Sequence, residues 1–220
     1  MFIPLKDLNP RRGHPVVNTL LIFTNVAIFI YQKTLPPYAS KAFMIANATI
    51  PQRIPQWFAG HVSFEVAFLP LLTSMFLHSG IAHIAGNMLF LWIFGDNVED
   101  YFGHLQYLFF YLVCGIGAGL LHVFFNFSSS LPAVGASGAI SGVMGAYIVL
   151  YPRARVLTLV FIFLVPIPAF IILGYWFVLQ FLGGITTLAA AAAATGGVAW
   201  WAHVGGFLAG VFITKLTERE

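Results

Sequence analysis

The chain has 220 residues, of which 60% are hydrophobic and only 8% are charged. A soluble domain carries roughly 25% charged residues, so this composition excludes a water-soluble globular protein and indicates membrane helices. The net charge of +3 is too small to indicate nucleic-acid binding, and a single cysteine, Cys114, excludes a disulfide within the chain. We therefore predict an all-α polytopic membrane protein that forms one domain over residues 1–220.

Six apolar segments are long enough to cross the hydrocarbon core of a bilayer, which takes about 20 helical residues. The fifth segment is interrupted by Pro166 and Pro168. A stretch of small residues, 186–196 with alanines at 189–194, precedes the sixth segment and is predicted as loop or helix extension. The predicted spans are 16–33, 82–102, 105–125, 133–151, 156–182 and 197–216.

The connection between the first two spans, residues 34–81, is long and rich in proline, which excludes a simple linker. Its last part, 64–77, is apolar, yet Pro70 and nearby polar side chains favour an interfacial or re-entrant segment over a full span. The predicted fold is thus a six-transmembrane-helix bundle with a long, partly membrane-embedded first loop.

Six spans place both termini on one side of the membrane, and the distribution of lysine and arginine predicts which side that is. The N-terminal residues 1–13 have no apolar stretch that ends in a small-residue cleavage site, so we expect no cleavable signal peptide. The predicted inner side carries Lys6, Arg11, Arg12, Arg153, Arg155, Lys215 and Arg219, and the outer side carries Lys33, Lys41 and Arg53. Residues 1–15 and the tail 217–220 are therefore predicted to be cytoplasmic.

Polar groups inside a membrane are costly, so each one is a candidate functional group. Ser137 lies at the start of the fourth span, His203 in the first third of the sixth, and His83 and Asn87 in the first turns of the second. These even-numbered spans all run from outside to inside in the predicted topology. Their polar groups therefore share one depth, a short way below the outer surface.

A serine hydroxyl becomes a nucleophile when a base removes its proton, and imidazole is the usual base. Ser137 and His203 form such a pair, and Glu65 is the only acidic residue on the predicted outer side, so we infer a Ser–His dyad without an acid. His83 and Asn87 are four residues apart and share one helix face. Together with the Ser137 amide they form a candidate oxyanion hole.

Glycines explain how the fourth and sixth spans could approach each other. Gly138 and Gly142 form one small-xxx-small pair, and Gly206 and Gly210 form another. Such faces allow close packing of helix backbones in lipid. Ordinary helix packing accounts for the glycines by themselves, but it does not account for a buried serine and histidine beside them.

Other hydrolytic chemistries do not fit the sequence. The esterase pattern Gly-x-Ser-x-Gly fails because Ala139 occupies the last position, and neither His78 nor His83 is followed by the glutamate of a zinc-protease motif. Asp96 has no second aspartate at its depth, which excludes an aspartyl intramembrane protease. These three classes of enzyme therefore do not fit the sequence.

Three motifs resemble those of the rhomboid intramembrane serine proteases: 135–138 (GASG), 202–210 (AHVGGFLAG) and 78–87 (HSGIAHIAGN). The resemblance covers nearly the whole six-helix core. It implies that Ser137 is the nucleophile and His203 the general base. It also implies that the reaction requires neither a metal nor an organic cofactor.

By the same resemblance His83 and Asn87 would stabilise the oxyanion, with Gly135, Gly138 and Gly206 in supporting positions. His78 would be an additional loop histidine with a structural or water-handling role. The chain departs from many members at Leu69-Pro70, where they carry Trp-Arg, and at Ser141, where an aromatic residue is common.

The resemblance further implies an endopeptidase that cuts single-span membrane protein substrates near the outer end of a transmembrane segment. The lean core without extra domains favours a bacterial inner membrane as its location. Small residues at the cut and helix-weakening residues nearby are expected. Two alternatives stay open: an inactive rhomboid-like protein that binds and escorts membrane helices, and a small-molecule channel or transporter.

Overall fold

The computed structural model describes residues 2–189 and 199–217. Most of the alanine stretch 189–194, the start of the predicted sixth span at 197 and the tail 218–220 lie outside the described residues. The elements are, in chain order, β1 (Phe2–Asp7), α1 (Val16–Thr34), α2 (Pro37–Asn47), α3 (Arg53–Phe58), α4 (Phe64–Phe68), α5 (Pro70–Thr73), the 3₁₀ turn η1 (Ser74–Phe76), α6 (Ile81–Phe102), α7 (His104–Phe125), α8 (Ser137–Leu150), β2 (Arg155–Val160), β3 (Phe163–Pro168), α9 (Ala169–Ala189) and α10 (Trp200–Thr217).

Six helices, α1 and α6–α10, form the polytopic membrane bundle and correspond to the six predicted spans. Within the described residues α1, α7 and α9 are individually long and apolar enough to cross a membrane. The segment 64–76 and α6 pass the same test as a pair bent by 77°, as expected for a broken span or a re-entrant loop. That each of the six helices crosses the bilayer stays a prediction.

The predicted start of the fifth span was wrong. Residues 155–168 form the antiparallel hairpin β2–β3, and the helix begins only at Ala169. Pro166 and Pro168 remove backbone donors that a helix interior requires, and the β-branched and aromatic residues before them favour a strand. β1 pairs with β2, which completes a three-stranded antiparallel sheet in the order β1-β2-β3.

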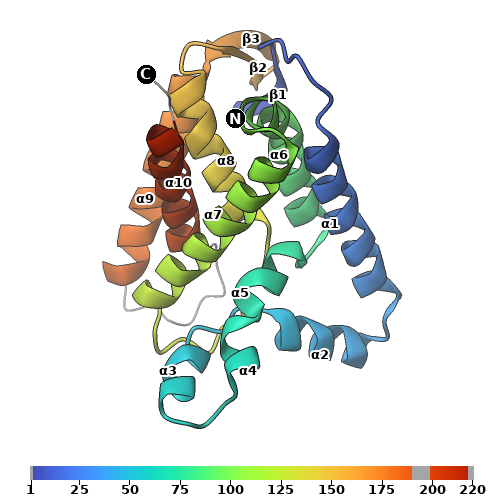
Figure 1. Cartoon of the computed structure of the whole chain (residues 1–220), viewed down its shortest axis with the longest axis vertical. Coiled ribbons are helices and arrows are strands. Elements are labelled where there is room, and N and C mark those ends of the chain that lie inside the picture. The colour runs from blue at the N-terminus through green and yellow to red at the C-terminus, as the bar shows by residue number, and fades with distance from the viewer. Residues whose placement is uncertain (1, 190–198, 218–220) are drawn as a thin grey trace.

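The sheet covers one end of the bundle, and α2–α5 gather at the other end (Figure 1). The C-terminal end of α10 lies near the sheet's end, because the Tyr101 hydroxyl donates to the carbonyl oxygen of Thr217 at 3.3 Å. The N-terminal strand and the connection from α8 to α9 therefore share one end of the molecule. The distribution of basic residues assigned both segments to the same, inner side of the membrane.

The first loop folds back on itself at the opposite end of the bundle. The Thr49 hydroxyl donates to the carbonyl oxygen of Pro70 at 2.9 Å, and the Thr73 hydroxyl donates to that of Asn47 at 2.9 Å. Proline at 70 is tolerated because it opens α5, where its missing N–H would have no helical partner. These bonds attach the loop to the segment that leads into α6.

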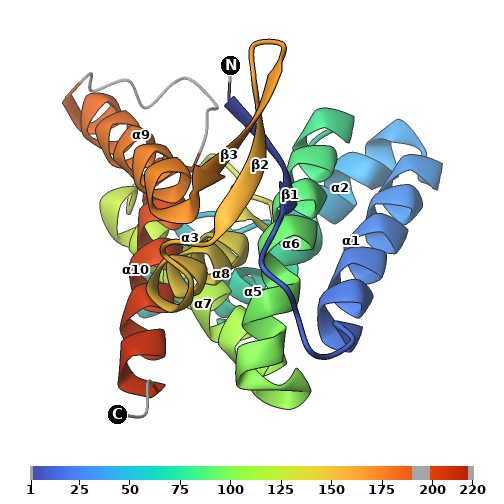
Figure 2. The same cartoon turned by 90° about the horizontal axis from the view of Figure 1, so that it is seen from above.

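Helix α8 lies inside the bundle, and residues 138–147 are buried without interruption. Its 14 residues extend only about 21 Å, less than the roughly 30 Å of the hydrocarbon core. Seen from the sheet's end, α1 and α9 lie on opposite flanks of the bundle (Figure 2). Because α8 is short and enclosed, its first residue lies below the membrane surface if its last residue reaches the opposite surface.

Candidate active site

Ser137 is the first residue of α8 and is half-buried. The chain enters the helix through Gly135, whose φ of 129° lies in a region that favours glycine. The Gly135 N–H donates to the carbonyl oxygen of Ser74 at 2.9 Å. A Cβ at position 135 would lie 2.7 Å from Nε2 of His83, so backbone conformation and close approach both require glycine there.

The structure brings Ser137 and His203 together from α8 and α10. Ser137 Oγ lies 2.8 Å from His203 Nε2, which is hydrogen-bond distance. The helices approach closely at glycines, since a Cβ at Gly206 would lie 1.9 Å from the carbonyl oxygen of Gly138. The glycine faces of the two helices are thus in contact beside the serine and the histidine.

The other ring nitrogen of His203 contacts a side chain on α9. Nδ1 lies 2.7 Å from Oε1 of Gln180, whose own Nε2 donates to the carbonyl oxygen of Trp176 at 3.3 Å. Gln180 was not predicted from the sequence. Its signal was a polar residue in the apolar segment 156–182, and the hydrogen bond to His203 becomes visible only in three dimensions.

Two side chains of α6, His83 and Asn87, lie close to Gly135, which leads into the helix that begins at Ser137. The position of a Cβ at Gly135 would be 2.7 Å from His83 Nε2 and 3.6 Å from Asn87 Nδ2. The Ser79 N–H and hydroxyl lie 3.5 and 3.0 Å from His83 Nδ1, which leaves the proton on Nε2 when Nδ1 accepts. Asn87 Nδ2 is buried and has no hydrogen-bond partner among the described residues.

His78 lies next to these donors. Its ring meets the His83 ring edge to face, with centroids 5.1 Å apart, and its backbone N–H donates to Oε1 of Gln32 on α1 at 3.3 Å. Both of its ring nitrogens are buried without a hydrogen-bond partner in the described part of the chain. A structural or water-handling role for His78 stays a prediction.

Ser141 lies one turn after Ser137 and is completely buried. Its hydroxyl donates to the Ser137 carbonyl oxygen at 2.6 Å. The small side chain at this position therefore hydrogen-bonds within α8.

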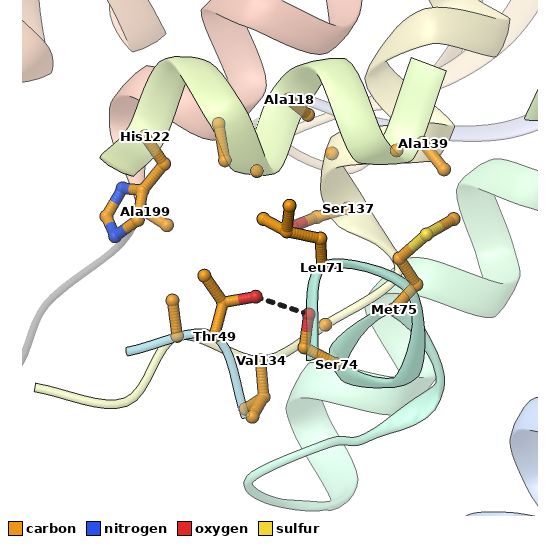
Figure 3. A pocket seen from close by; sticks show the side chains of 16 residues that line it. Thr49, Leu71, Ser74, Met75, Ala118, His122, Val134, Ser137, Ala139 and Ala199 are labelled. Atoms are coloured by element: carbon orange, nitrogen blue, oxygen red, sulfur yellow. Dashed lines mark hydrogen bonds between the residues drawn. The ribbon is translucent and has the colours of Figure 1, made fainter. Parts of the chain in front are cut away.

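A cavity of about 40 Å³ adjoins Ser137 (Figure 3). Thr49 and Ser74, whose hydroxyls are 2.9 Å apart, lie across it from Ala118 on α7, and His122 also lines it. A water needs roughly 10–15 Å³ on this measure, so the cavity has room for a few waters or one small side chain.

Comparison with known proteins places the chain among membrane proteins of one family. Residues 66–220 match the family described as Rhomboid domain. Rhomboid protein 1, mitochondrial, of Saccharomyces cerevisiae is 28% identical over 217 residues, which cover 90% of this chain and 60% of the relative.

Two further relatives match shorter stretches. Rhomboid protease GluP of Bacillus subtilis is 46% identical over 76 residues, 34% of this chain and 14% of GluP. The presenilin-associated rhomboid-like protein, mitochondrial, of Bos taurus is 30% identical over 106 residues, 46% of this chain and 27% of that protein. The chain thus covers less than two thirds of each of these relatives. The Rhomboid domain match includes all the candidate site residues, and this chain belongs to the rhomboid family.

Proposed function

We propose that this chain is an intramembrane serine endopeptidase in which Ser137 is the nucleophile and His203 the general base. The observation that carries the proposal is the 2.8 Å contact between Ser137 Oγ and His203 Nε2. The unpartnered Nδ2 of Asn87, which lies near Gly135, supports the same role, because a buried donor without a partner is available for a substrate oxygen. The relative GluP is named a rhomboid protease, which supports proteolysis as the reaction.

In the first half of the reaction, Ser137 Oγ attacks the carbonyl carbon of the scissile peptide while His203 Nε2 takes the hydroxyl proton. Negative charge develops on the carbonyl oxygen. The Ser137 N–H, at the start of α8, and the side-chain donors of His83 and Asn87 stabilise that charge. His203 then gives the proton to the leaving amine, the carbon–nitrogen bond breaks, and an acyl-enzyme remains.

In the second half, a water attacks the acyl carbon and His203 again takes the proton. The ester bond to Ser137 breaks, the serine oxygen regains a proton from His203, and the new carboxylic acid leaves. The cavity next to Ser137 supports this step, since its polar wall of Thr49, Ser74 and His122 can hold water at the required place.

The substrates we propose are single-span membrane proteins cut near the outer end of the span. A helix in lipid has every backbone group hydrogen-bonded, so it must unwind before Ser137 can reach its carbonyl carbon. The small volume of the cavity favours small side chains at the cut. Substrates with glycine or proline nearby should therefore be cut faster than a uniform leucine helix.

We also propose that residues 1–15 and the C-terminal tail lie on the inner side of the membrane. The shared position of β1 and the Arg153–Arg155 connection at one end of the bundle supports this orientation, because arginine and lysine favour the inner side. A bacterial inner membrane stays a prediction, since the relatives include both mitochondrial and Bacillus proteins. The absence of a required cofactor also stays a prediction.

The test is cleavage of a single-span reporter substrate in liposomes by the wild type and by Ser137→Ala and His203→Ala. Ser130→Ala is the matched control, because Ser130 is exposed in the loop between α7 and α8. Labelling by a serine-directed phosphonate provides a second readout that does not depend on the substrate chosen. We expect cleavage and labelling in the wild type and the control, and neither in Ser137→Ala.

The possible outcomes separate the proposals. Cleavage that survives Ser137→Ala in folded protein would exclude Ser137 as the nucleophile. Binding of the reporter without cleavage or labelling by the wild type would favour an inactive protein that escorts membrane helices.

A further inference from the structure

The base His203 is held on both sides, and the second contact has no role in the reaction described above. We propose that Gln180 on α9 is a positioning residue that fixes the tautomer and orientation of His203. This inference rests on the proposed function and adds a third member to its serine and histidine. The member is a neutral amide rather than a carboxylate.

The hydrogen bonds around Gln180 are directional. Its Nε2 donates to the carbonyl oxygen of Trp176, which turns Oε1 toward the imidazole. Oε1 can only accept, so at 2.7 Å the Nδ1 of His203 must carry a proton. In a neutral imidazole the lone pair is then on Nε2 and faces the Ser137 hydroxyl at 2.8 Å. This is the tautomer that a general base requires.

Burial makes the contact specific. Gln180 is only 7% exposed, so a polar side chain there requires a partner. The ring of Trp176 lies beside His203, with centroids 5.8 Å apart and planes tilted by 38°. The amide and the indole come from consecutive turns of α9, and together they restrict both the rotation and the tilt of the imidazole.

A neutral acceptor also suits the location. The sequence from 156 to 214 contains no aspartate, glutamate, lysine or arginine, so this part of the bundle carries no fixed charge from those side chains. A carboxylate at membrane depth is costly, whereas an amide provides the same acceptor oxygen without a charge. The position of α9 against α10 thereby becomes part of the active-site geometry.

The test compares Gln180→Met, which keeps the volume but removes the acceptor, with Gln180→Glu, which keeps an acceptor oxygen. Gln106→Met is the matched control, because Gln106 is exposed on α7. For Gln180→Met we expect kcat on the reporter to fall about 10²-fold with KM unchanged, the lower range for a positioned general base. Gln180→Glu should recover most of that loss, and the control should equal the wild type.

A second readout reports on His203 without activity. In ¹⁵N-histidine NMR of the Ser137→Ala protein, we expect the His203 signal of the Nδ1–H tautomer, and a mixture of tautomers after Gln180→Met is added. An unchanged tautomer together with unchanged kcat would overturn the role of Gln180 while leaving the protease assignment intact. If Gln180→Met does not fold, Gln180→Glu decides, because loss of the Nδ1–H signal there would equally contradict the proposal. An inactive wild type with the expected tautomer would instead contradict only the proposed function.

Discussion

Two clusters of polar side chains lie in this apolar bundle, one at the sheet's end and one at the candidate active site. At the sheet's end Glu99 is 1% exposed, and its carboxylate accepts from the backbone N–H groups of Val17 and Asn18 at 2.9 and 2.7 Å and also contacts His104. The two N–H groups belong to the first turn of α1, where backbone donors have no helical partner. Glu99 therefore caps a neighbouring helix.

Other polar groups at the sheet's end are paired in the same way. Asp100 accepts from the N–H groups of Arg12 and Gly13, and Asn97 donates to Asp7. Burial of the Asp7 carboxyl in β1 is the largest influence on its pKa and raises it. This cluster fastens the N-terminal segment to α6.

The cluster at the candidate active site differs because several of its polar atoms have no partner. Asn87 Nδ2 and both ring nitrogens of His78 are buried without hydrogen-bond partners among the described residues. A buried donor without a partner lowers stability, and at this site it is available to a bound ligand. The comparison teaches that the paired carboxylates at the sheet's end hold the fold together, whereas the unpaired groups of Asn87 and His78 leave hydrogen-bonding capacity for a substrate.

The largest expected effect is on activity at the serine. Ser137→Ala and His203→Ala should each lower kcat by about 10⁴-fold or more, because the two groups act as one unit. The double variant should be no worse than either single variant in the same liposome assay. Losses that multiply in the double variant would mean that the two side chains act independently.

The next largest effect is on stability, at the sheet's end. Glu99→Ala leaves two helix donors without an acceptor and should lower the free energy of unfolding by about 3 kcal/mol or more, since hydrogen bonds to charged groups contribute roughly 1.5–3 kcal/mol each. Thermal unfolding in detergent measures this, with the exposed Glu65→Ala as the matched control. An unchanged melting temperature would show that Glu99 does not cap α1 in the folded protein.

Asn87→Ala should lower activity and leave stability intact, whereas Glu99→Ala should lower stability. We expect kcat to fall about 10²-fold, the usual loss for one oxyanion donor. The melting temperature should stay the same or rise, because the substitution removes a donor that has no partner. Parallel cleavage and unfolding measurements check both halves, and a clear drop in melting temperature would contradict the assignment of Asn87 to the site.

The smallest expected effect concerns the glycine contact between α8 and α10. A Cβ at Gly210 would lie 2.0 Å from the carbonyl oxygen of Gly142, so Gly210→Ala should cost about 1–3 kcal/mol of stability through overpacking. Gly174→Ala on α9 is the control, since no described atom outside its own helix backbone lies within 4 Å of the added carbon. Equal melting temperatures for the two variants would exclude tight packing at Gly210.

The sequence predicted the membrane bundle and the Ser137–His203 pair because both leave local signals. A run of apolar residues indicates a span by itself, and a serine or histidine inside such a run is conspicuous because it is costly. The short length of α8 was not predicted, since residues 133–136 are as apolar as the helix that follows them.

The sheet and Gln180 were missed for a different reason. Residues 156–165 are apolar enough for a helix, and their strand structure depends on pairing with β1, which is far away in sequence. Gln180 is a single polar residue in an apolar segment, and its partner His203 is 23 residues away on another helix. Such non-local pairings cannot be read from hydropathy.

The pairing of β1 with β2 also sets an order for biosynthesis. Phe2 is made before its partner Val160, which follows only after α1 and α6–α8 have been made. At 5–20 residues per second, β1 waits for about 10–30 s without its neighbour. The sheet therefore forms late, and it joins the segment before α1 to the connection before α9. A nascent chain arrested before Arg155 would carry β1 without its partner strand.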